Sequence, residues 1–144
     1  MARDLVHNAV RECLENDGWI ITHDPYSLYL ERRTLSIDLG AERVIAATKG
    51  NEKIAVEVKS FIKESFIYDF HEILGQYLIY EEFLNEQETD RELYLAVEDT
   101  IFATKFSNDN DILRICKKFK IKILIYANCL QQRLAATLIA AIKA

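Results

Sequence analysis

Two side chains of opposite charge, Glu57 and Lys59, flank one valine in the apolar run Val56-Glu57-Val58-Lys59. If this run is a β-strand, its alternation places the carboxylate and the ammonium on one face and the valines on the other. A carboxylate can hold Mg²⁺ beside a phosphodiester, and a nearby lysine can orient the attacking water or stabilise developing charge. The pair therefore predicts metal-dependent hydrolysis of a phosphodiester.

Such a magnesium site calls for a second carboxylate, because Mg²⁺ prefers oxygen ligands and retains several waters. The preceding run offers Asp38 and Glu42. If the connecting turn centres between the glycine and asparagine of its Lys-Gly-Asn sequence, antiparallel pairing sets Lys59 opposite Glu42. Glu42 is then about 7 Å along the strand from the position that faces Glu57, and Asp38 is roughly 20 Å away. We therefore expect Glu42 as the second ligand, with Asp38 reachable only through a bulge or bend.

Further candidates lie on two predicted helices. Gln76 and Tyr80 are four residues apart, so they share the polar flank of a helix that spans about 65–85. Gln76 could contact a phosphate or a metal-bound water, and Tyr80 could donate to a phosphate or stack on a base. His7, on the first predicted helix, could help to position the substrate. The plain alternative is a packed tyrosine, a surface glutamine and a boundary histidine.

A Glu-X-Lys sequence on a strand is common and often marks only a solvated face. The flanking valines, the acidic preceding run and the polar stripe on the next helix favour a site here. Other chemistries lack their signatures, since His23 and His71 have no cysteine or histidine partner at zinc-ligand spacing. The sequence also has no glycine-rich phosphate loop and no Gly-X-Ser-X-Gly elbow.

The elements that must position these residues follow from apolar periodicity and turn signals. We expect helices at 3–17, 65–85, 109–119 and 130–143, and strands at 19–22, 28–30, 36–47, 54–59, 92–97 and 121–126. This order predicts one α/β domain over residues 1–144, with a mixed sheet, flanking helices and an αβββαβ core.

The net charge of −5 argues against a strong autonomous DNA binder, because such proteins usually present a basic surface to the phosphates. Three widely separated cysteines, Cys13, Cys116 and Cys129, fit neither a disulfide framework nor paired zinc knuckles. The start of the chain has no signal-like apolar region, and the apolar stretch 134–142 is too short to span a bilayer. We expect a cytoplasmic protein that does not enter the membrane.

The strand and helix motifs resemble the PD-(D/E)XK nuclease superfamily, including the Gln-xxx-Tyr feature of its RecB-like members. Longer matches resemble the XisH family over about residues 2–126. These are Ala2-Arg3-Asp4 with His7, Gly18-Trp19 to Asp24-Pro25, Gly40-Ala41-Glu42-Arg43, Val56-Glu57-Val58-Lys59-Ser60-Phe61, Gly75-Gln76-Tyr77, and Asp90-Arg91 to Leu93-Tyr94-Leu95-Ala96-Val97. The superfamily's Pro-Asp pair is missing, since Asp38 follows Ile37 and Glu42 follows Ala41.

The resemblance implies a restriction-endonuclease-like fold. It also implies a role with the partner XisI in controlling recombinase-dependent excision of the fdxN element during heterocyst differentiation. Two functions follow as alternatives: a DNA endonuclease using Mg²⁺, with Mn²⁺ as a substitute, or a non-catalytic adaptor acting through XisI or the recombinase. A third reading is an α/β domain whose Glu-X-Lys is only surface. The oligomeric state stays open, with a homodimer as one form.

Overall fold

The computed structural model describes residues 2–46, 50–61, 64–127 and 138–142. Within those ranges the main sheet has six strands, in the spatial order β1 (Ile20–His23), β4 (Leu39–Ala46), β5 (Gly50–Val58), β6 (Arg91–Glu98), β7 (Ile123–Tyr126) and β8 (Leu138–Ile142). The β5–β6 and β6–β7 pairs are parallel, and the other pairs are antiparallel. The predicted mixed sheet is therefore confirmed.

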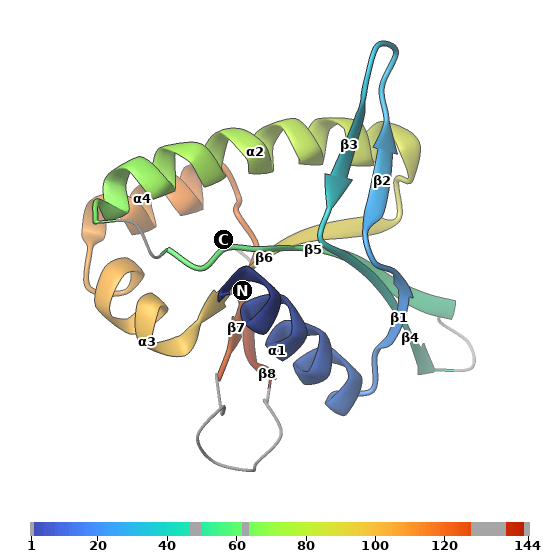
Figure 1. Cartoon of the computed structure of the whole chain (residues 1–144), viewed down its shortest axis with the longest axis horizontal. Coiled ribbons are helices and arrows are strands. Elements are labelled where there is room, and N and C mark those ends of the chain that lie inside the picture. The colour runs from blue at the N-terminus through green and yellow to red at the C-terminus, as the bar shows by residue number, and fades with distance from the viewer. Residues whose placement is uncertain (1, 47–49, 62–63, 128–137, 143–144) are drawn as a thin grey trace.

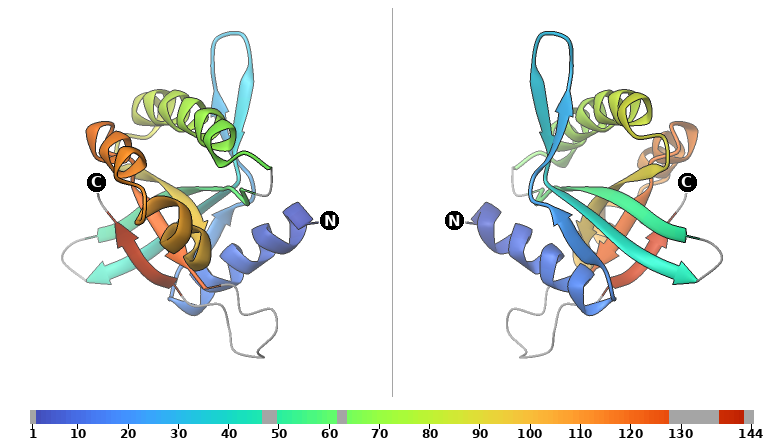
Figure 2. Two further views of the ribbon diagram at one scale, coloured as in Figure 1. Left: turned by 90° about the vertical axis from the view of Figure 1, so that its left-hand side faces the viewer. Right: turned by 90° about the vertical axis from the view of Figure 1, so that its right-hand side faces the viewer.

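One face of this sheet is covered by α1 (Ala2–Asn16), as Figures 1 and 2 show. Its residues Val10, Cys13 and Leu14 recur at helical spacing and are fully buried. They pack against sheet residues that include Val56 and share one core cluster with them. The helix ends before Gly18, whose φ of +91° suits glycine because it has no Cβ to clash.

The opposite face is covered by α2 (Phe66–Gln87) and α4 (Asn110–Lys118), which share a second core cluster with Ala55 of β5. Between β6 and α4 lie a single turn, α3 (Asp99–Ile101), and a π-helical turn, η1 (Phe102–Phe106), neither of which the sequence predicted. The domain is therefore a layered helix–sheet–helix structure, and successive residues of β5 face opposite layers.

A second, two-stranded sheet projects from the body as a hairpin (Figures 1 and 2). It pairs β2 (Tyr26–Tyr29) with β3 (Thr34–Ile37) in antiparallel register. An isolated hairpin is only marginally stable, but Tyr26, Leu28 and Ile37 are buried in the core beneath α2. The hairpin is an insert between β1 and β4, so α1, β1, β4, β5, α2 and β6 retain the predicted αβββαβ order.

The predicted register of the central hairpin is wrong. Glu42 pairs with Lys53, whereas the sequence reading paired it with Lys59. The reason is that β5 already begins at Gly50, so the link from β4 falls in residues 47–49, outside the described residues. The partner of each β4 residue is therefore six residues earlier in β5 than expected, which moves Glu42 away from Glu57.

Two further differences concern strand boundaries and the end of the chain. The expected strand 36–47 is split at Asp38 into the end of β3 and all of β4. The expected closing helix 130–143 is wrong where it is described, because residues 138–142 form β8 against β7. Its other residues, 130–137 and 143, lie outside the described residues. Short apolar runs fit either structure, and here pairing with the exposed edge of β7 outweighs the helix propensity of alanine.

Among the described residues, no helix is both long enough and apolar enough to cross a membrane. Cys13 and Cys116 are both buried, and Cys129 lies outside the described residues.

Candidate functional site

Asp38 and Glu57 meet where β4 begins and β5 ends. Leu39 pairs with Val56, so the next step outward sets Asp38 beside Glu57. The backbone N–H of Asp38 donates to Glu57 Oε1 at 3.3 Å, and the backbone N–H of Val58 donates to Asp38 Oδ2 at 2.8 Å. Each carboxylate thus accepts a hydrogen bond from the backbone of the segment that carries the other carboxylate.

The local chain path explains this meeting. Asp38 occupies a bend between β3 and β4, where the chain leaves the projecting hairpin and enters the main sheet. The strand register, in which Leu39 pairs with Val56, sets Asp38 beside Glu57, so no shortening of the path by a bend is needed. Glu57 is only 8% exposed, so the strand holds this carboxylate largely within the protein.

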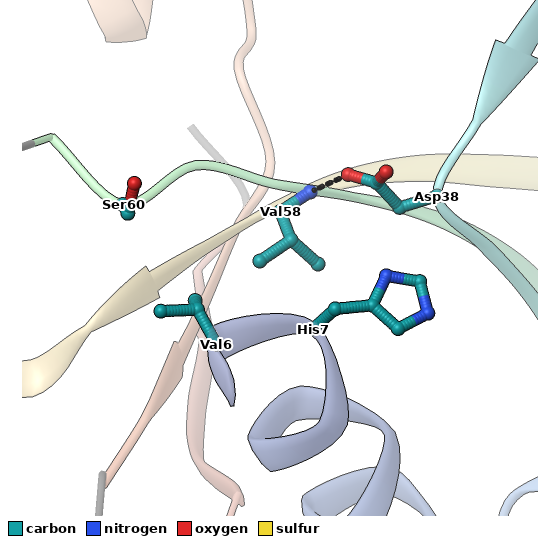
Figure 3. Close-up of a pocket in the computed structure, with 5 residues that line it drawn as sticks. All are labelled: Val6, His7, Asp38, Val58 and Ser60. Atoms are coloured by element: carbon teal, nitrogen blue, oxygen red, sulfur yellow. Dashed lines mark hydrogen bonds between the residues drawn. The ribbon is translucent and has the colours of Figure 1, made fainter. Parts of the chain in front are cut away.

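A small hollow of about 20 Å³ opens beside Asp38. Figure 3 shows the residues that line it, which are Val6, His7, Asp38, Val58 and Ser60. This volume has room for a group of about the size of one water molecule. The lining residues come from α1 and from the chain at the ends of β3 and β5, so segments far apart in the sequence form the hollow.

His7 contributes to the hollow from α1, on the same side as the Asp38 carboxylate (Figure 3). Its Nε2 lies 2.8 Å from Asp24 Oδ1, and Arg11 also bonds to the Asp24 carboxylate. An ionised carboxylate only accepts, so the Asp24 contact favours a proton on Nε2. Asp24 and Arg11 therefore fix the orientation of the imidazole, and sequence reasoning did not identify either of them.

Lys59 lies on the other side of the site, near α2. Ala55 belongs to the core cluster beneath α2, so alternation along the strand directs Glu57 and Lys59 toward that helix. Lys59 Nζ lies 3.6 Å from Glu72 Oε1, with the lysine side chain 18% exposed. Glu72 thus ties the lysine to α2, a contact that no local sequence pattern signalled.

Gln76 and Tyr80 follow Glu72 along α2 at intervals of four residues, so the three share one helix face. Gln76 is half-buried, one helical turn beyond the residue that binds Lys59. Tyr80 is also half-buried and packs against the apolar core. Along α2, Gln76 therefore lies nearer than Tyr80 to Glu72, the residue that contacts Lys59.

Glu42 belongs to a different cluster, centred on Arg91. Arg91 is 1% exposed and bonds to Glu42 Oε1 at 3.0 Å and to Glu88 Oε1 at 2.7 Å. Its guanidinium also donates to the backbone carbonyls of Ala41 and Ile54. Glu42 thus neutralises a buried arginine, and the expectation that it lies nearest Glu57 is wrong. A buried arginine at a strand start has no distinct sequence signature.

The cluster around Arg91 strongly lowers the pKa of one of its carboxylates, that of Glu88. Hydrogen bonds from Arg91, and then from the Tyr26 hydroxyl, lower the pKa of Glu88 to about 2. Burial acts in the opposite direction, but the charged donors outweigh it. Glu88 is therefore a structural anion that holds the base of the β2–β3 hairpin to β6.

Within the described part of the chain, no group of three or more His, Cys, Asp or Glu side chains is arranged to hold a metal. That excludes a closed protein cage there, such as a structural zinc site. Magnesium is commonly bound through one or two carboxylates together with waters and substrate phosphates. Asp38 and Glu57 are two carboxylates whose oxygen atoms are hard donors, so these residues fit Mg²⁺ or Mn²⁺.

Comparisons with known proteins extend over nearly the whole chain. A family model described as XisH protein matches residues 1–133. The crystal structure of an XisH family protein from Nostoc punctiforme PCC 73102 has a TM-score of 0.83 and 36% identity, covering 97% of this chain and 100% of its own. The crystal structure of an fdxN element excision controlling factor protein from Anabaena variabilis has a TM-score of 0.83 and 38% identity, and it covers 98% of this chain and 100% of its own. No curated protein matches.

Proposed function

The chain belongs to the XisH family, and on that premise we propose that it is a controlling factor for excision of a DNA element that acts by Mg²⁺-dependent phosphodiester hydrolysis. The observation that carries the chemical part is the contact of Asp38 with Glu57 at the ends of adjoining strands. Lys59, two residues beyond Glu57, provides the cation. The αβββαβ order of the core further supports a PD-(D/E)XK nuclease-like site.

The two carboxylates would hold the metal. Each accepts one backbone N–H bond, which fixes its position in the absence of substrate. When bound, Mg²⁺ would neutralise charge on the phosphate and lower the pKa of an attacking water. The low exposure of Glu57 favours this arrangement, because partly desolvated charges interact more strongly than solvated ones.

Lys59 would act on the attacking water or on the charge that develops at phosphorus. Glu72 limits the range of positions open to its long side chain by holding Nζ at 3.6 Å. Gln76, one turn further along α2, would support the same region by contacting a phosphate or a water. These assignments give α2 the role of positioning the cationic half of the site.

His7 would support the carboxylate half of the site. It lines the hollow beside Asp38 and is oriented by Asp24. With the proton held on Nε2, the other ring nitrogen can accept a hydrogen bond from a water in the hollow. His7 would therefore help to position a water or a phosphate.

The direct test is cleavage by purified protein with Mg²⁺ or Mn²⁺ of single-stranded, duplex, nicked and branched DNA. We expect metal-dependent cleavage that Lys59→Ala abolishes while circular dichroism shows a folded protein. Glu12→Gln on the exposed outer face of α1 is the matched control and should cleave as the parent does. Intact DNA across all substrates and both metals would overturn the hydrolytic proposal.

A second function is favoured by the net charge of −5, which makes strong unaided DNA binding unfavourable. In this case the chain is an adaptor that acts through an XisI-type protein or the recombinase, and the partner supplies the basic surface. Co-purification with the XisI-type protein and excision that survives Glu57→Gln in cells would support the adaptor. Loss of excision in that variant, with partner binding intact, would rule out the purely non-catalytic form.

A further inference from the structure

A second hollow lies far along the projecting hairpin from Asp38, between the end of β2 and the C-terminal part of α2. Its volume is about 480 Å³. The residues that line it are Tyr29, Leu30, Glu31, Phe83, Glu86 and Gln87, and we call it the hairpin groove. Figure 1 shows the hairpin crossing α2 near the end of that helix. The groove shares no lining residue with the hollow beside Asp38.

The hairpin groove presents apolar surface to solvent. Tyr29 is 74% exposed, although it is a large aromatic side chain on a strand. Leu30 and Phe83 are half-buried and form the inner wall. Ile79, 50% exposed, lies one helical turn before Phe83 on the same face of α2 and extends the apolar strip. Exposed apolar surface that continues from a groove is typical of an interaction site.

One side of the groove is joined by hydrogen bonds, because Gln87 bridges the helix to the hairpin. Its Oε1 accepts from the Tyr29 backbone N–H at 2.9 Å, and its Nε2 donates to the Ser27 carbonyl at 3.0 Å. The same Nε2 donates to the Tyr26 hydroxyl at 3.2 Å. These bonds hold the groove open without a ligand, and a preformed site loses less entropy on binding.

The charged groups of the groove are all negative. Glu31 and Glu86 are exposed at its rim, and its lining includes no lysine or arginine. Arg32 and Arg33 follow at the hairpin tip but are not part of the lining. Two carboxylates beside aromatic and aliphatic side chains would repel a nucleic-acid phosphate and attract a cationic side chain.

We propose that the hairpin groove binds a segment of a protein partner in which lysine or arginine flanks a large apolar side chain. The apolar side chain packs against Tyr29, Leu30 and Phe83, and its cationic neighbours pair with Glu31 and Glu86. The inference goes beyond the proposed metal site, because none of these residues contributes to it. A partner held here also brings basic charge to a chain whose net charge is −5.

The probe is a random ten-residue peptide library displayed on phage and selected on the intact protein, followed by titration of synthetic copies of the enriched peptides. We expect enrichment of lysine or arginine next to leucine, isoleucine or phenylalanine. Glu86→Lys should weaken binding of these peptides by about tenfold or more, since it reverses a charge at the contact. Glu12→Lys makes the same charge change on α1 and should leave binding unchanged.

Two further variants separate the groove from the general charge of the protein. Glu31→Lys should weaken binding like Glu86→Lys, and Tyr29→Ala should weaken it without any change of charge. All these positions are exposed, so the variants should fold, which circular dichroism checks. The proposal is overturned if no peptide is enriched, if the enriched peptides lack basic residues, or if Glu86→Lys and Glu12→Lys bind them equally. It is also overturned if Glu86→Lys instead changes self-association in sedimentation or binding of duplex DNA.

Discussion

The backbone N–H of Asp38 donates to the Glu57 carboxylate, while the Asp38 carboxylate accepts from Val58, the residue that follows Glu57. This exchange joins the bend before β4 to the end of β5. Of the two candidate acids, Asp38 therefore contacts Glu57, and Glu42, paired with Lys53 and bound to Arg91, does not. We accordingly propose Asp38 as the second metal ligand.

The first prediction separates these two acids. Asp38→Asn should lower metal-dependent cleavage by about 100-fold or more, because losing one metal ligand forfeits several kcal/mol of charge stabilisation. Titration with Mn²⁺, followed by electron paramagnetic resonance, should show weaker binding. Glu42→Gln is the matched control and should bind Mn²⁺ as the parent does while lowering the melting temperature. The reverse pattern would restore Glu42 as the ligand.

A second prediction concerns Glu72, a positioning residue that contacts Lys59 at 3.6 Å. Glu72→Gln should reduce the cleavage rate by roughly threefold to tenfold, since the lysine side chain becomes less restricted. Mn²⁺ affinity should stay the same, because the proposed role of Glu72 is to position Lys59 and not to bind the metal. Glu64→Gln, an exposed change just before α2, serves as the comparison. Equal rates in the parent and both variants would remove Glu72 from the site.

The third prediction tests the buried arginine. Arg91→Met should lower the free energy of unfolding by about 3 kcal/mol, because it leaves the anions Glu42 and Glu88 without their shared cation. Arg43→Met removes an arginine that is 35% exposed and paired with Asp17 and Glu52, so its cost should stay below about 1 kcal/mol. Urea unfolding of the two variants gives both values. A similar loss of unfolding free energy in both variants would show that the burial of Arg91 does not set the size of the loss.

The pH dependence of stability follows from Glu88, whose pKa is lowered to about 2 by Arg91 and Tyr26. A carboxyl with a lowered folded-state pKa stabilises the protein fully above its ordinary pKa. That contribution is lost as the pH falls from about 4.5 toward about 2. Glu88→Gln should therefore be less stable than the parent at pH 7, and the difference should shrink between pH 5 and pH 3. A difference that stays constant over this range would contradict the ionic role.

The layered fold could be predicted from sequence because its helices and strands have clear periods. The apolar positions of α1 and α2 recur every three or four residues, and the valines of β5 alternate with charged residues. Glu57 and the helix with Gln76 were placed in the right elements for the same reason, whereas Lys59 lies just beyond the end of β5. These inferences depend only on neighbours along the chain.

The choice between Asp38 and Glu42 could not be made in this way. It depends on register, which shifts with the position of the turn. The roles of Asp24, Glu72 and Arg91 likewise come from contacts between elements distant in sequence. Such contacts have no local pattern, so only the folded chain reveals them.

The last prediction uses two glycines to test whether the entry into β4 controls the site. A Cβ at Gly40, two residues after Asp38, would lie 3.0 Å from the Cβ of His23 and 3.0 Å from a ring carbon of Tyr26. Gly40→Ala should therefore lower the free energy of unfolding by about 1–3 kcal/mol, and by displacing the start of β4 it should also weaken Mn²⁺ binding.

Gly75 is the opposite case, because a Cβ there meets nothing within 4 Å and the residue lies inside α2. Gly75→Ala should raise the free energy of unfolding by roughly 0.5–1 kcal/mol and leave Mn²⁺ binding unchanged. Thermal unfolding and Mn²⁺ titration of both variants make the comparison. If Gly40→Ala destabilised the fold yet bound Mn²⁺ normally, the position of Asp38 would not depend on the close packing of β4 against β1 and the hairpin.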